Sequence, residues 1–254
     1  TTAQNQAWLD QVKQLSTDLT ALSTVGRDAT RGVNPDFVAL EDLAQDFDDN
    51  LRGLAEGDAE YNVQALPGEM QDELAAVAAS WQTMRKAVDA VVKGETAYEN
   101  VAGAADELAE TLTTMVEAGI RADKVGFLER MKVQSAQVLR QGRDATGSAQ
   151  QLKATADEFE SGATQLPEAW ESVRTAVDSI VADAPGVAEM QQSAATLPGE
   201  AFIVIGNAKI LEQAMTDYVA RYAQLPLAVI GAAVLAVLSL AGFIVLFLGT
   251  ARRE

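Results

Sequence analysis

The sequence contains no cysteine and no histidine. Without cysteine there can be no disulfide, thiolate nucleophile, iron–sulfur cluster or cysteine-ligated zinc. Without histidine, the commonest general base and the commonest metal ligand are missing as well. Only carboxylates, lysines, tyrosines and hydroxyl groups remain for chemistry. The composition therefore predicts a protein that is not an enzyme, uses no cofactor and holds no metal ion.

Positive charge is also scarce. The chain has 19 Lys and Arg residues against 37 Asp and Glu residues, which gives a net charge of −18. Such a surface repels the phosphate backbone of nucleic acid, so nucleic acid is not an expected partner. Most of the chain should also avoid anionic lipid headgroups. A solvated acidic surface with no dedicated partner explains the same charge equally well.

One stretch near the C-terminus carries no charge at all. No charged residue lies between Arg221 and Arg252, and residues 225–248 are apolar almost throughout. A hydrocarbon core needs about 20 residues of helix, and this run is long enough. A buried core helix is the alternative, but globular helices seldom run so far without a polar face. The pattern predicts a transmembrane helix over residues 223–251, surrounded by membrane lipid.

The flanks of this run predict its orientation. Tyr218 and Tyr222 precede it as an interfacial aromatic pair, while Arg252 and Arg253 follow it. By the positive-inside rule, residues 252–254 begin a cytoplasmic region and the long acidic part lies outside. Because no signal peptide precedes Thr1, we expect an export signal or an earlier membrane helix upstream.

The acidic part reads as helical throughout. Its one strand-like patch, residues 201–205, is too short to distinguish a strand from a buried helix. Proline and an acid mark predicted helix starts at Asp36, Pro67, Pro167 and Pro198. The predicted helices span residues 4–33, 36–55, 67–93, 95–121, 124–148, 150–163, 167–183 and 187–223.

Two short motifs recur in the same order. The run Gly26-Arg27-Asp28-Ala29-Thr30 returns at residues 142–146, and the run from Trp81 to Asp89 is echoed from Trp170 to Asp178. This repetition predicts two tandem modules, residues 1–122 and 123–222. Short links favour antiparallel neighbours in each module. The expected fold is all-α: two antiparallel helical-bundle modules followed by one transmembrane helix.

The tryptophan motif has a structural explanation. Trp81, Arg85 and Asp89 share one helical face, as do Trp170, Arg174 and Asp178. An arginine can cover the indole ring and pair with the acid one turn later. A shared packing role explains this recurrence without a ligand.

The glycine motif leaves two alternatives open. Glycine inside a helix costs about 1 kcal/mol relative to alanine, so Gly26 and Gly142 suggest a close approach. Helix packing is one explanation, with Asp28 and Asp144 beside it. The other is a small anionic ligand held by Arg27 or Arg143, because the guanidinium fork matches a carboxylate.

The residues 22–30, 138–146 and 218–253 together resemble the type IV pilus methyl-accepting chemotaxis transducers, whose sensory region is a PilJ-type periplasmic domain followed by a second transmembrane helix. The resemblance implies a homodimeric receptor in a bacterial inner membrane with its large domain in the periplasm. It also implies pilus subunits or a small ligand as outer partners, and CheA/CheW-type proteins as partners of a cytoplasmic part. Its output would be type IV pilus-dependent twitching motility. Two alternatives remain: a membrane-tethered helical scaffold or adaptor of a surface machine, and the sensor domain of a transmembrane histidine kinase.

Overall fold

The computed structural model describes residues 2–30, 36–58, 63–120, 122–140, 144–160 and 166–251, and its described side chains exclude those of residues 2–3, 27, 29–30, 122–123 and 222–251. Within these ranges the chain is almost entirely helical, which confirms the all-α prediction. The elements are α1 (Thr2–Thr30), α2 (Phe37–Glu56), β1 (Gly57–Asp58), β2 (Val63–Gln64), η1 (Gly68–Met70), α3 (Gln71–Lys93), α4 (Glu95–Glu117), α5 (Ala122–Arg140), α6 (Ala145–Glu160) and α7 (Pro167–Ala251).

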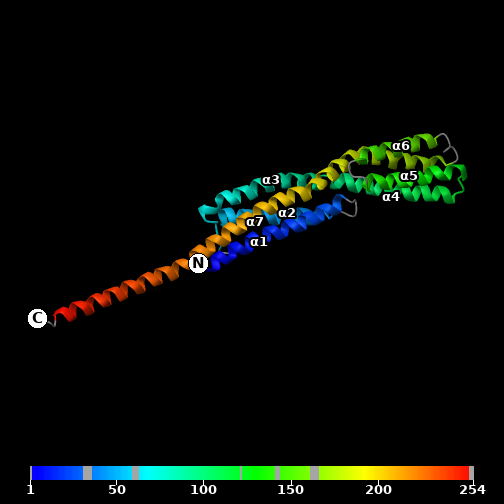
Figure 1. Ribbon diagram of the computed structural model, residues 1–254. Helices are drawn as coiled ribbons and strands as arrows, with labels where there is room; N and C mark the ends of the chain where they lie inside the picture. The colour runs from blue at the N-terminus through cyan, green and yellow to red at the C-terminus, as the bar shows by residue number, and fades with distance from the viewer. Residues whose placement is uncertain are drawn as a thin grey trace.

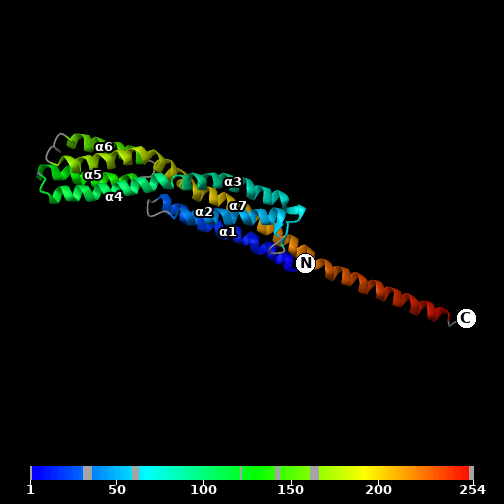
Figure 2. The same ribbon diagram turned by 180° about the vertical axis from the view of Figure 1, so that it is seen from behind.

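The helices form two four-helix bundles placed end to end (Figure 1). In the first bundle, α1 packs against α2 and α7, and α3 closes the square by packing against α2 and α7. In the second bundle, α5 packs against α4 and α6, and both α4 and α6 pack against α7. Helix α7 is therefore the fourth helix of both bundles. The view from behind shows α2 on the side of the first bundle opposite α7 (Figure 2).

This packing cuts across the predicted boundary at residue 122. Helix α4 precedes that boundary in the sequence, but it lies with α5, α6 and the first part of α7. The middle part of α7, as far as Met215, instead lies in the first bundle, where it packs against α1 and α3. The second bundle therefore consists of four consecutive helical segments, whereas the first consists of α1, α2, α3 and a segment of α7 from much later in the chain.

Two successive registers of buried residues explain why α7 can serve both bundles. Its buried positions follow spacings of three and four residues, which place them on one side of a helix. Two registers overlap at Val187–Ala194, where Met190 and Gln191 are both buried. This is a stammer, a local shift of the heptad pattern that turns the buried face. It lies where α7 passes from the second bundle to the first. The buried residues among the described side chains of α7 are Trp170, Val173, Ala176, Val177, Ile180, Ala184, Val187, Met190, Gln191, Ala194, Leu197, Ala201, Val204, Ala208, Leu211 and Met215.

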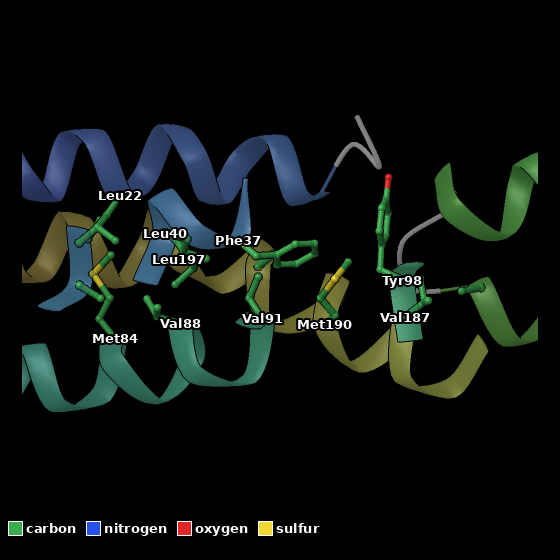
Figure 3. Packing of buried hydrophobic residues seen from close by; sticks show 14 of the residues in the cluster. Leu22, Phe37, Leu40, Met84, Val88, Val91, Tyr98, Val187, Met190 and Leu197 are labelled. Carbon is green, nitrogen blue, oxygen red and sulfur yellow. The ribbon is translucent and has the colours of Figure 1, made fainter. Parts of the chain in front are cut away.

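The hydrophobic core is continuous across the join between the bundles. Leu22, Leu40 and Met84 fill the first bundle near the join, while Tyr98 and Val187 belong to the second (Figure 3). Phe37 meets Tyr98 with ring centroids 5.9 Å apart in an edge-on arrangement. The two bundles are thus packed together and not merely tethered.

Several predicted boundaries are confirmed. The Asp36 carboxylate accepts a hydrogen bond of 2.9 Å from the Ala39 amide and caps α2, whose start at Phe37 was expected. A positive φ of 87° at Gly57 ends α2, and one of 84° at Gly119 follows α4. The polar connector after α2 holds β1 and β2, which pair antiparallel with Asp58 opposite Val63.

Other boundaries were wrong. The predicted helices 167–183 and 187–223 are one helix, and Pro198 lies inside it, not at a start. The strand-like patch at residues 201–205 is helical as well. The predicted helix 124–148 ends at Arg140, and α6 begins at Ala145 and not at residue 150.

Among the side chains that the structure describes, no helix is both long and apolar enough to cross a membrane. The predicted span at residues 223–251 and the tail at 252–254 lie outside those side chains, and the membrane prediction stays a prediction. The backbone of α7 continues as a helix to Ala251 and projects beyond the first bundle, at the end where α1 begins (Figure 1).

Candidate functional site

A polar pocket lies between α1 and α2, beside β1. Its volume is about 740 Å³. Oxygen acceptors dominate the lining, because five of its side chains are carboxylates and three are amides. Arg52 is the one cation among the residues that line it, and it already pairs with Asp49. The lining residues are Gln11, Gln14, Asp18, Asp46, Asp49, Asn50, Arg52, Gly53, Glu56, Gly57 and Asp58.

The buried carboxylate of Asp18 forms the inner wall of this pocket. The residue is 5% exposed. Its Oδ1 accepts a hydrogen bond of 2.7 Å from Gln14 Nε2, and its Oδ2 accepts one of 3.1 Å from Asn50 Nδ2. Burial raises the pKa of Asp18; the two hydrogen bonds act in the opposite direction, and nearby Asp46 raises the pKa further. A carboxylate held only by neutral amides retains an uncompensated negative potential.

The pocket offers hydrogen-bond acceptors to a ligand. Gln11 also lines it, and the Gln11 Oε1 atom is buried without a hydrogen-bond partner among the described residues. Acceptors of this kind favour a ligand that is cationic or rich in hydrogen-bond donors. Within the described part of the chain, no group of three or more acidic side chains is arranged to hold a metal ion.

The sequence did not single out Asp18, although a signal was present. Buried residues of α1 recur at Val12, Leu15, Leu19 and Leu22, and Asp18 lies on the same stripe. An acid on the apolar face of an amphipathic helix is unusual and marks a position to inspect.

The two predicted anion-binding arginines lie outside the described side chains. Arg27 is placed in α1 only by its backbone, and Gly142 and Arg143 fall in an undescribed segment. Their assignment to a ligand therefore stays a prediction. Asp28 and Asp144 are both exposed. Since α1 continues to Thr30 but α6 begins at Ala145, the two copies of the motif occupy different places: one ends a helix, and the other precedes one.

Gly26 makes the close approach that the packing alternative requires. It is buried, and a Cβ atom built there would stand 2.5 Å from Leu197 Cδ1 on α7. The glycine therefore lets α1 approach α7 closely where the bundle is near its join. This contact agrees with the packing alternative for Gly26, and the ligand alternative for Arg27 stays a prediction.

The first tryptophan motif forms a polar network between α2 and α3. Trp81 packs against Phe47 with the ring centroids 4.2 Å apart and the ring planes tilted by 41°, and its Nε1 donates to Asp48 Oδ1 at 2.6 Å. Arg85 donates two hydrogen bonds to Glu41, at 2.8 and 3.2 Å. Its Nε also lies 3.3 Å from Asp89, so the predicted pair one turn later is present. The hydrogen bonds between Arg85 and Glu41 lower the pKa of the Glu41 carboxyl group and raise the pKa of the Arg85 guanidinium group.

The second motif repeats the ring packing but not the polar network. Trp170 packs against Phe159 of α6 with the ring centroids 5.0 Å apart and the ring planes tilted by 43°. Its Nε1 is buried and has no partner among the described residues. Arg174 pairs with Glu160 at 3.2 Å, while Asp178 pairs with Lys153 at 3.2 Å. In both copies the tryptophan thus packs its helix against the preceding one. Trp81 joins α3 to α2, and Trp170 joins α7 to α6.

The comparisons with known proteins agree with the resemblance drawn from the sequence. No curated protein matches the chain. The match that is found begins inside α1, includes α2 and α3, and ends inside α4, so it covers the first tryptophan network and the α2 side of the pocket, while Gln11, Gln14 and Asp18 of α1 precede it. Residues 19–108 match the family model described as the type IV pili methyl-accepting chemotaxis transducer N-terminal region.

Proposed function

We propose that this chain is the extracytoplasmic sensory region of a chemoreceptor-like transducer that controls type IV pilus-dependent twitching motility. The match at residues 19–108 is the observation that carries this proposal. The proposal places the bundles in the periplasm of a bacterium and the end of α7 in its inner membrane. It includes the homodimer and the CheA/CheW-type cytoplasmic partners that the resemblance implies.

The arrangement of α7 supplies a mechanism for such a receptor. The helix packs in both bundles and continues without interruption to Ala251. Rotation or displacement of either bundle therefore moves the helix that leaves the domain. A stimulus biases this movement only if it binds one of two states more tightly than the other.

The pocket between α1 and α2 is the proposed point where a stimulus acts. Helices α1 and α2 form one side of the bundle that α7 completes, and α1 packs directly on α7. A ligand that changes the spacing of α1 and α2 is thus one helix away from α7. The acceptor-rich lining favours a cationic ligand or the basic side chains of a pilus subunit.

A phase-insertion experiment distinguishes a receptor from a scaffold. Two alanine-rich inserts are placed after Arg221 in the full gene: one of seven residues and one of five. The seven-residue insert turns the following helix by about −20° and the five-residue insert by about 140° at 100° per residue. A receptor should retain twitching with seven and lose or lock it with five, in cells of matched protein level. Equal motility with both inserts would favour the scaffold alternative.

Topology is tested independently with cysteine labels, because the native sequence has no cysteine. Val133 is 57% exposed and is a suitable outer position, whereas Ser148 is buried and is not. Val133→Cys in intact cells should react with a membrane-impermeant maleimide, and Glu254→Cys should react only after lysis. The reverse pattern would overturn the proposed orientation.

A further inference from the structure

Helix α5 carries a run of positive charge on a strongly acidic chain. Residues 130–143, which include the end of α5, contain no Asp or Glu. Helix α4, which packs beside α5, has acidic residues and no Lys or Arg. The end of α5 is therefore locally positive, although the net charge of the chain is −18. The basic residues of this stretch are Arg130, Lys132, Arg140 and Arg143.

Two arginines on α5 make no ion pair with any described side chain. They are Arg130 and Arg140, and both are exposed. The Cζ atom of Arg130 lies 4.4 Å from the centroid of the Phe127 ring. A ring contact leaves the charge of the guanidinium group uncompensated and its N–H groups available to a carboxylate. The other arginines with described side chains each pair with a carboxylate of this chain: Arg52, Arg85, Arg174 and Arg221.

Val133 lies at the centre of the face that α5 turns away from the bundle core, and it is 57% exposed. At 100° per residue, Arg130 and Arg140 lie within about 60° of Val133 around the helix. Along the helix axis the two arginines are about 15 Å apart, with Val133 between them. The exposed face thus has an apolar centre between two unpaired cations. The buried residues of α5 lie on the opposite side: Leu128, Met131, Ser135 and Val138.

Two hollows share Val133 and Gln137 as part of their lining. The larger has a volume of about 380 Å³ and reaches Gln151 on α6. The smaller has a volume of about 330 Å³ and includes Lys132, whose Nζ atom donates to Thr113 Oγ1 of α4 at 2.8 Å. The α5 surface is therefore hollowed toward both of the neighbouring helices.

The side chains of the larger hollow can bond to a polypeptide. Three of them are amides, and Gln134, Gln137 and Gln151 make no side-chain hydrogen bond to a described residue. An amide side chain both donates and accepts hydrogen bonds. Glu129 is the one acid among the residues that line the two hollows. We name this surface the α5 face: Arg130, Lys132, Val133, Gln134, Gln137, Arg140 and Gln151.

We propose that the α5 face binds an acidic segment of a different protein, with carboxylates against Arg130 and Arg140 and an apolar side chain on Val133. Each guanidinium group can bind a carboxylate with two N–H groups. The amides of the larger hollow can bond to the backbone or the polar side chains of the same segment. Because most of the surface repels an acidic partner, complementary charge directs such a segment to the α5 face. This partner goes beyond the proposed function and differs from the ligand of the pocket between α1 and α2, which favours positive charge.

Neither a lipid headgroup nor a second copy of this chain fits the α5 face as well. Gln191 Nε2 donates to the Leu139 carbonyl at 2.6 Å, which places the Arg140 end of α5 beside Gln191. The predicted membrane span begins at residue 223, about 48 Å of helix after Gln191. The second bundle lies at the end of the molecule away from the C-terminus (Figure 1). Two copies of the chain, each with a net charge of −18, repel one another over most of their surface.

A pair of peptides tests whether the α5 face recognises carboxylates. The probe is a fluorescent, acetylated and amidated helical peptide of Leu, Ala and Glu, and its control has Gln in place of every Glu. Fluorescence anisotropy is measured with the full chain in a neutral detergent. The Glu peptide should bind at least about fivefold more tightly than the Gln peptide, and less tightly at high salt, because exposed ion pairs are screened. Equal affinity for the two peptides, or no saturable binding of the Glu peptide up to about 1 mM, would refute the proposal.

Charge-matched variants test which arginines bind the peptide. Arg130→Gln with Arg140→Gln removes both unpaired cations of the α5 face. The control, Arg174→Gln with Arg221→Gln, removes the same charge from two exposed arginines that already pair with acids. Affinity for the Glu peptide should fall at least about fivefold in the first double variant and less than about twofold in the control, while both melt close to the wild-type temperature. Equal losses of affinity would show that binding follows net charge and not the α5 face, and would rule the proposal out.

Two outcomes would assign the α5 face to another occupant. If polyphosphate displaced the Glu peptide as effectively as unlabelled Glu peptide at equal charge concentration, the face would be a general anion site and the proposal would fail. If the double variant of Arg130 and Arg140 sedimented as a smaller oligomer than the wild type, the occupant would be a second copy, which also contradicts the proposal. We expect weaker displacement by polyphosphate and equal sedimentation. None of these measurements uses motility, so their failure would leave the phase-insertion test of the proposed function standing.

Discussion

A Cβ atom on Gly94 would stand 2.5 Å from the Cβ atom of Met190, so α7 passes the joint between α3 and α4 with no space for a side chain. On the other side of this joint, a Cβ atom at Gly186 would stand 2.7 Å from Ala97 Cβ. These contacts involve atoms next to the backbone, which cannot rotate away. The join between the two bundles therefore depends on two glycines, one on each partner.

Gly94→Ala and Gly186→Ala should each destabilise the protein by about 1–3 kcal/mol, the usual cost of adding a group to a filled core. Gly103→Ala is the matched control, because Gly103 lies inside α4 with open space around it. That change should be neutral or stabilising by up to about 1 kcal/mol. Urea unfolding followed by circular dichroism measures all three. Equal stabilities of the three variants would show that the close approach is not required.

Replacement of Trp81 and of Trp170 by phenylalanine should destabilise the protein to different extents. Trp81→Phe removes both indole volume and the hydrogen bond to Asp48, whereas Trp170→Phe removes volume and a buried N–H group that has no described partner. Leaving an acceptor unpaired costs about 1–3 kcal/mol when it is buried, and Asp48 is partly exposed. Trp81→Phe should therefore be the more destabilising by about 1 kcal/mol. A larger loss for Trp170→Phe would contradict the assigned geometry.

Arg85 and Arg174 offer a similar comparison. Arg85 is 21% exposed and binds Glu41 with two nitrogen atoms, while Arg174 is 52% exposed and makes a single bond to Glu160. Lysine keeps the charge but loses the planar fork. Arg85→Lys should cost about 1 kcal/mol and Arg174→Lys less than about 0.5 kcal/mol, as expected for exposed pairs. Thermal unfolding of both variants decides this, and the reverse order would refute it.

Features of the fold could be predicted from the sequence where they depend on residues that lie close together in the chain. The start of α2 was predicted because Asp36 supplies a cap that acts over three residues. The repeated tryptophans were predicted to pack alike, and the rings do so against Phe47 and Phe159. Ring packing depends on the apolar face of the motif, which is similar in both copies. Its polar partners differ because they come from another helix.

The failures come from tertiary context. Pro198 was read as a helix start, because an interior proline costs about 3 kcal/mol in an isolated helix. In α7 it is exposed, between Leu197 and Ala201 that are buried against the bundle. Burial of the residues on both sides of Pro198 keeps α7 continuous in spite of the destabilisation by the proline. The pocket was missed because it depends on Asp18 and Asn50, which are 32 residues apart and meet only when α1 packs on α2.

Asp18 and Glu41 should respond to pH with opposite signs, since burial raises the pKa of Asp18 while the Arg85 hydrogen bonds lower that of Glu41. A raised folded pKa means that the unfolded chain releases its proton first as the pH rises. The contribution of Asp18 to the free energy of unfolding is therefore full below the ordinary carboxyl pKa of about 4 and is lost as the pH rises through the folded pKa. The contribution of Glu41 is present above the ordinary pKa and is lost as the pH falls through the lowered one.

The variants Asp18→Asn and Glu41→Gln isolate these two contributions. Asparagine accepts only one of the two hydrogen bonds that Asp18 receives, but that loss does not change with pH. The stability of Asp18→Asn relative to wild type should therefore increase between about pH 3 and neutral pH, whereas that of Glu41→Gln should decrease. Both are measured by urea unfolding of the full chain in one detergent over that range. Slopes of the same sign would show that the Asp18 carboxylate is not desolvated in the folded pocket.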